Sequence, residues 1–123
     1  FNYYGDWIIM NIFTEKPWGH EILWASCERY AGKILFIKKG HRLSRQYHEK
    51  KEETIRVLEG TLRLEVGAAG DGVMFLKPGE SFHVEPLMTH RFCAEDDDVT
   101  LVEVSTTELD DVVRLEDDWG RSS

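Results

Sequence analysis

The sequence predicts an all-β domain, folded as a two-layer sandwich or a small barrel. Three observations lead to this prediction: short runs of alternating apolar and polar residues, turn signals about every 8–12 residues, and no helical crossover between the runs. A βαβ fold needs such crossovers, so that class is excluded. We expect about nine strands, at residues 21–26, 33–40, 42–48, 54–60, 61–67, 73–80, 81–86, 90–95 and 99–105.

Glycine and proline mark the ends of several of these runs. The strand at 33–40 ends in a glycine turn, and the strand at 73–80 stops at a Pro-Gly pair. The clearest strand is 61–67, where leucine and valine alternate with charged residues, as expected of a strand with one buried face. The glycine-rich segment 68–72 is expected to form a hairpin tip, and 99–105 is the last strand.

Only the tail of the chain is predicted to be helical. Thr107 is followed three residues later by Asp110, which is close to a capping box. Apolar residues recur at helical spacing from Leu109 until the charged Glu116, so the expected C-terminal helix is short. Gly120 is expected to end it.

Composition limits the class of protein. The chain has 123 residues, the size of one domain, and a formal net charge of −8, which argues against a general binder of nucleic acid or acidic membranes. No apolar stretch approaches the ~18 residues of a membrane span. Two cysteines, Cys27 and Cys93, are too few for a disulfide framework, so a cytoplasmic protein is expected.

The beginning of the chain has two interpretations. We divide the chain into an N-terminal extension or edge strand at residues 1–14 and a single domain at 15–123. Residues 1–9 precede Met10, so they are either cloning sequence or a natural extension that forms an edge strand. Exposed strand edges pair readily between chains, and edge pairing by this segment would produce a homodimer.

The segment "RQYHEKKEET", residues 45–54, is either a solvated charged loop or part of a metal site. Divalent metals bind His nitrogen and carboxylate oxygen atoms that converge from different strands. Gln46 and His48 are two apart, so on a strand they share a face. A bend after His48 would bring Glu53 to the same place, and His90 follows a turn before another expected strand. Spacing alone leaves both interpretations open.

The window from Gly40 to His90 resembles the cupin double motif. The matching positions of the first motif are Gly40, Gln46, His48, Glu53 and Gly60, with glutamine in place of the first histidine. The second motif, from Gly79 to His90, is weaker, because Pro86 is displaced by one position and Leu87 replaces the glycine.

Over residues 15–121 the chain resembles the cupin domain of type II mannose-6-phosphate isomerases. It shares "KPWG" at 16–19, "LSRQYH" at 43–48, and the tail "DDVVRLEDDWGR" at 110–121, with Trp119 in place of a tyrosine. The resemblance implies a double-stranded β-helix, or jelly-roll, barrel that holds a divalent metal: Zn²⁺ or Mn²⁺ first, Fe²⁺ or Ni²⁺ as further options. The implied ligands are Gln46, His48, Glu53 and His90.

The resemblance also implies a sugar phosphate substrate, interconverted between its aldose and ketose forms. Glu103 shares a strand face with Leu101, which makes it our candidate for the base that moves a proton between C1 and C2, unless it is an outward edge charge. Lys33 is a second candidate catalytic group. Arg114 either binds the phosphate or forms a salt bridge in the tail. His83 is a candidate for lining the substrate cavity.

Two other functions compete with an isomerase. The same barrel could be a non-catalytic module that binds a metal or a small carbohydrate, since one fold hosts many functions. Two histidines and one glutamate also resemble the facial triad of a non-haem iron oxygenase. Gln46 argues against the oxygenase, because an amide is a weak iron ligand.

Overall fold

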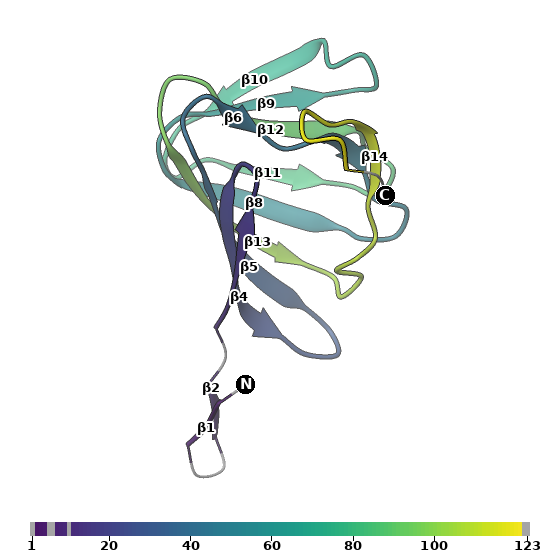
Figure 1. The fold of residues 1–123 in the computed structure, drawn as a ribbon. Helices are drawn as coiled ribbons and strands as arrows, with labels where there is room; N and C mark the ends of the chain where they lie inside the picture. Colours follow the sequence, from purple (N-terminus) through teal and green to yellow (C-terminus); the bar gives the residue numbers. More distant parts are fainter. Residues whose placement is uncertain (1, 5–6, 10, 122–123) are drawn as a thin grey trace.

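The computed structural model describes residues 2–4, 7–9 and 11–121, which fold into two six-stranded antiparallel β-sheets and one separate two-stranded hairpin (Figure 1). These residues form no helix, and therefore none that is long and apolar enough to cross a membrane. In the first sheet the order is β11 (Ser81–Val84), β8 (Glu53–Glu59), β13 (Val99–Ser105), β5 (Ala31–Ile37), β4 (Gly19–Ser26) and β3 (Ile12–Lys16). In the second it is β10 (Gly72–Leu76), β9 (Leu62–Val66), β12 (His90–Ala94), β7 (Arg45–Tyr47) and β14 (Val113–Glu116), with β6 (His41–Arg42) also paired to β12.

The core lies between the two sheets. Along β8, β9 and β13 the apolar residues point inward at every second position, as the sequence pattern predicts. The all-β class is thus confirmed, but the closed barrel is not: within the described residues no strand of one sheet pairs with a strand of the other. Fully buried core residues are Ile37, Ile55, Val57, Leu62, Leu64, Val99 and Leu101.

The predicted C-terminal helix is wrong. Residues 113–116 form strand β14, which pairs with β7 through Val113↔Tyr47 and Arg114↔Gln46. Consecutive valines favour a strand, and the edge of β7 offers hydrogen-bonding groups that an isolated helical turn would not satisfy. Ion pairs then hold the strand, because Glu116 contacts both Arg45 and the fully buried Arg91.

The N-terminal region consists of short strands. β3 forms the edge of the first sheet, in register with β4 from Ile12↔Leu23 to Lys16↔Gly19. β1 (Asn2–Tyr4) and β2 (Trp7–Ile9) form a separate hairpin, drawn in purple away from the two sheets in Figure 1. Met10 and residues 1, 5 and 6 of the predicted extension lie outside the described residues.

Candidate metal centre

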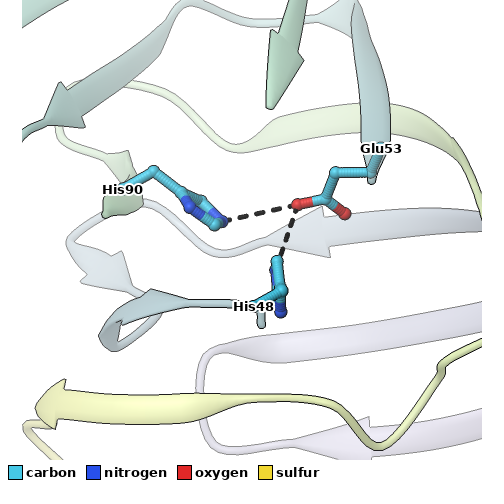
Figure 2. A group of neighbouring side chains, drawn as sticks. All are labelled: His48, Glu53 and His90. Atoms are coloured by element: carbon cyan, nitrogen blue, oxygen red, sulfur yellow. Dashed lines mark ion pairs between the residues drawn. The ribbon is translucent and has the colours of Figure 1, made fainter. Parts of the chain in front are cut away.

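Strand ends from both sheets bring three of the predicted ligands together. His48 directly follows β7, His90 begins β12 in the same sheet, and Glu53 begins β8 in the opposite sheet. One ligand atom from each residue lies within 4.8 Å of those of the other two. The three side chains point toward one another (Figure 2), and all are buried, with exposed fractions of 3%, 3% and 1% for His48, Glu53 and His90.

Backbone carbonyls determine which nitrogen of each imidazole faces the group. Nδ1 of His48 lies 2.6 Å from the carbonyl oxygen of Asp111, and Nδ1 of His90 lies 3.0 Å from that of Met88. A carbonyl only accepts, so each Nδ1 must carry the proton. The remaining nitrogen, Nε2, then directs its lone pair at Glu53 in a neutral ring, which is the usual state of a metal-bound histidine.

This arrangement fits a divalent cation. Nε2 of His48 and Nε2 of His90 each lie 3.4 Å from Oε1 of Glu53, and both nitrogens are buried without a hydrogen-bond partner. Two lone pairs and a carboxylate oxygen facing one another repel unless a cation lies between them. The alternative, two buried imidazolium rings with centroids 5.1 Å apart and a single shared carboxylate, places like charges together.

A second carboxylate lies beside the group and is linked to it by a buried lysine. Nζ of Lys51 lies 3.4 Å from Oε2 of Glu53 and 3.2 Å from Oε2 of Glu103. Burial and then the charge of Glu53 raise the pKa of Glu103 to about 8. Burial also raises the pKa of Glu53, but hydrogen bonds with the two imidazoles and Glu103, together with the charge of Lys51, outweigh it and hold that pKa well below its ordinary value. The two carboxyl groups therefore differ widely in their affinity for a proton.

A cavity of about 110 Å³ adjoins this centre and is rich in cationic side chains. Gln46, His48 and Glu103 contribute to its wall. Its cationic lining residues are Lys16, Lys33, Lys51, Arg114 and Arg121, against the two acids Glu21 and Glu103. A second cavity of about 440 Å³ shares Lys16, Lys33 and Arg114 with the first. Cationic side chains therefore outnumber acidic ones in the lining of this cavity, although the whole chain carries a net charge of −8.

The other predicted residues take different places around this cavity. Lys33 lines it while contacting Glu21, with Nζ 2.8 Å from Oε2. Gln46 also lines it, and its Oε1 accepts a 2.6 Å hydrogen bond from Ser44. His83 does not belong to the lining: it is exposed on β11, where its Nε2 lies 2.7 Å from Oε2 of Glu52. β11 pairs with the edge of β8, and this turns His83 away from the sheet interior.

Two residues important for this geometry were missed by the sequence reasoning. Lys51 was not singled out within the charged segment 45–54, but it is buried. The signal that could have identified it is its spacing: it lies two positions before Glu53, so in an extended segment both side chains share a face. Asp111 contacts the ligand segment from the far end of the chain, and no local pattern indicates this.

Comparison with known proteins agrees with the fold. The family model described as "Cupin domain" matches residues 33–105. Over 112 residues the chain is 36% identical to mannose-1-phosphate guanylyltransferase ManC of Salmonella typhimurium, covering 86% of this chain and 22% of that protein. The chain thus spans less than a quarter of the length of the curated relatives it matches, 22–23% in each case.

Solved structures resemble the chain at low sequence identity. The capsular polysaccharide assembling protein CapF of Staphylococcus aureus superposes with a TM-score of 0.75 at 16% identity, over 90% of this chain and 33% of that one. A sugar phosphate isomerase from Silicibacter pomeroyi gives a TM-score of 0.59 at 20% identity, over 70% of this chain and 59% of that one. At these identities the likeness concerns the fold alone.

Proposed function

This chain belongs to the cupin domain family, and on that premise we propose that it is a metal-dependent isomerase that interconverts the aldose and ketose forms of a sugar phosphate. The observation that supports this most is the pairing of a buried His-Glu-His group with a second carboxylate in a cavity lined by cations. The sequence similarity to a mannose-1-phosphate guanylyltransferase supports a phosphorylated hexose, mannose 6-phosphate first, as the ligand.

The proposed metal ligands are His48, Glu53 and His90, with Gln46 as a fourth. Zn²⁺ and Mn²⁺ suit two imidazoles and a carboxylate, and Fe²⁺ and Ni²⁺ accept the same atoms. When bound, the cation polarises the carbonyl and hydroxyl oxygens of a sugar as a Lewis acid.

The proton transfer is assigned to Glu103. Its carboxylate takes the proton from C2 of the aldose, which leaves an enediol-like intermediate, and returns the proton to C1 to form the ketose, while the proton of the C2 hydroxyl passes to the oxygen on C1. A pKa of about 8 is close to neutral pH, so the group exchanges a proton readily in either direction. The ammonium of Lys51, 3.2 Å away, stabilises the ionised form of the carboxylate before the first transfer and after the second.

The phosphate is assigned to the cationic side of the cavity. Lys33 and Arg114 line both the smaller and the larger cavity, together with Lys16, so a phosphate between the two cavities meets all three. Arg114 comes from β14 and is held opposite Gln46 by strand pairing. We therefore place Lys33 among the phosphate-binding residues and leave the base role to Glu103.

The test is an isomerisation assay on protein stripped of metal with EDTA and reloaded separately with each of the four metals. We expect turnover of mannose 6-phosphate with Zn²⁺ or Mn²⁺, lost in His48→Ala and kept in the exposed control His83→Ala. Metal binding with no turnover of any phosphosugar would instead support a non-catalytic binding module. Oxygen uptake with Fe²⁺ would support an oxygenase.

A further inference from the structure

The loop between β7 and β8, which carries His48 and leads to Glu53, is held by hydrogen bonds from a distant part of the chain. Its backbone N–H groups from Glu49 to Glu52 all donate to side chains beyond β13. Those of Glu49, Lys50 and Lys51 donate to the Asp111 carboxylate at 3.1, 2.7 and 2.9 Å. That of Glu52 donates to Oγ1 of Thr106 at 3.0 Å.

Asp111 also contacts a ligand directly. Its backbone carbonyl is the group that lies 2.6 Å from Nδ1 of His48 and keeps the proton on that nitrogen. One residue therefore orients the His48 ring with its backbone and holds the next three residues of the loop with its side chain. The same three N–H groups include that of Lys51, whose ammonium contacts Glu53 and Glu103.

Asp111 lies close to a paired strand. It is two residues before β14, which pairs with β7, the strand that directly precedes the ligand loop. Beyond β14, Asp118 accepts hydrogen bonds from Nε and Nη2 of Arg42 at 2.6 and 2.9 Å. The carboxylate therefore reaches the loop from a segment that is anchored directly after Asp111, which suits a group that orients metal ligands.

We propose that Asp111 is a positioning residue of this centre, which sets the orientation of His48 and the path of the loop to Lys51 and Glu53. The proposal rests on the metal centre proposed above. Replacement by alanine leaves three backbone donors of the loop without their acceptor while keeping the carbonyl of residue 111. Loss of such an outer contact typically weakens metal binding about 10–100-fold.

The experiment compares Asp111→Ala with Asp110→Ala, which removes the same charge one position earlier from an exposed side chain. Zn²⁺ affinity is measured by competition with a chromophoric chelator, at a temperature where circular dichroism shows every protein folded. We expect about 10–100-fold weaker Zn²⁺ binding in Asp111→Ala and unchanged binding in Asp110→Ala. Asp111→Asn keeps one acceptor oxygen, so its Zn²⁺ affinity should lie between those of Asp111→Ala and Asp110→Ala. Equal affinity in Asp111→Ala and wild type would overturn the proposal, even if the variant melts at a lower temperature.

A second measurement tests the positioning role of Asp111 in the absence of metal. In ¹⁵N NMR spectra of the metal-free protein, we expect His48 to hold its proton on Nδ1 in wild type and to populate both tautomers in Asp111→Ala. The amides of residues 49–51 should lose protection from hydrogen exchange at the same time. An unchanged tautomer and unchanged protection would refute the positioning role. A wild type that binds no metal but gives the expected spectra would instead count against the proposed isomerase alone.

Discussion

The ammonium group of Lys51 lies 3.2 Å from Oε2 of Glu103, and both side chains are almost fully buried. The same ammonium lies 3.4 Å from Oε2 of Glu53, so a single lysine contacts two neighbouring buried carboxyl groups. Without it, these groups would lie together with no cation beside them in a medium that screens charge poorly. Lys51 therefore contributes both to the stability of the folded protein and to the charge state of the two acids at the proposed metal centre.

Replacing Lys51 should destabilise the protein strongly. Lys51→Met leaves buried acids without their cation, which typically costs about 3–5 kcal/mol in the free energy of unfolding. Lys50→Met, at the exposed neighbouring position, should change it by less than about 0.5 kcal/mol. Urea denaturation of the metal-free proteins measures both, and similar losses in the two variants would contradict the assignment. Adding Glu103→Gln to Lys51→Met should recover part of the loss.

The contribution of Glu103 to the stability of the metal-free protein should fall as the pH rises from about 4.5 to about 8. In the folded protein Glu103 keeps its proton up to its pKa of about 8, whereas in the unfolded chain it loses the proton near the ordinary value of 4.5. Within that window the folded state binds more protons than the unfolded chain. The contribution of Glu103 to the free energy of unfolding therefore decreases as the pH increases. Glu53, whose pKa is lowered, acts oppositely and only below about 4.5, because its contribution is lost as the pH falls. In Glu103→Gln the decline between these pH values should be smaller, as urea midpoints at several pH values would reveal.

Adding Zn²⁺ should raise the melting temperature of the EDTA-treated protein. A ligand at 100 times its Kd adds about 2.7 kcal/mol to the free energy of unfolding, which for a domain of this size corresponds to a shift on the order of 10 °C. His90→Ala removes one buried nitrogen of the centre and should abolish the shift. His20→Ala, on the outer face of β4, serves as the control and should keep it. A full shift in His90→Ala would mean that the metal binds elsewhere.

Leu87→Gly should stabilise the protein. Leu87 has a φ of 68°, in the left-handed region, and its side chain is 66% exposed, so little packing is lost on truncation. Relief of about 1–2 kcal/mol of backbone strain exceeds the greater flexibility of glycine in the unfolded chain, which costs about 0.4–1 kcal/mol. Met88→Gly, next in the chain and without a positive φ, should destabilise instead. Thermal unfolding distinguishes the two signs.

Gly60 and Gly40 provide a matched pair. Their φ angles are 79° and 80°, but a Cβ at Gly60 would lie 2.1 Å from the carbonyl oxygen of Asp98, whereas a Cβ at Gly40 meets no atom within 4 Å. Gly40→Ala should therefore cost only the strain of the left-handed conformation, about 1–2 kcal/mol. Gly60→Ala must also displace backbone and should cost clearly more, as chemical denaturation would measure. Equal costs would mean that the backbone near Asp98 yields easily.

The sequence could predict the strands and the residues that face one another because these depend on local alternation and spacing. The alternation in 61–67 and 99–105 identifies the buried faces of β9 and β13. The motif spacing selects His48, Glu53 and His90, which the fold brings within 4.8 Å. Their service as metal ligands remains a prediction, as does the role of Glu103.

Only the tertiary structure decided which segments lie beside one another. The tail has a helical spacing of its own, but it becomes a strand because the edge of β7 satisfies its backbone and two arginines pair with Glu116. Lys51 and His83 look alike in sequence, as polar residues near turns, yet one lies between two acids and the other at an exposed edge. Burial and charge pairing depend on contacts between segments far apart in the chain. Local periodicity, which records only the face of a strand on which a residue lies, cannot specify them.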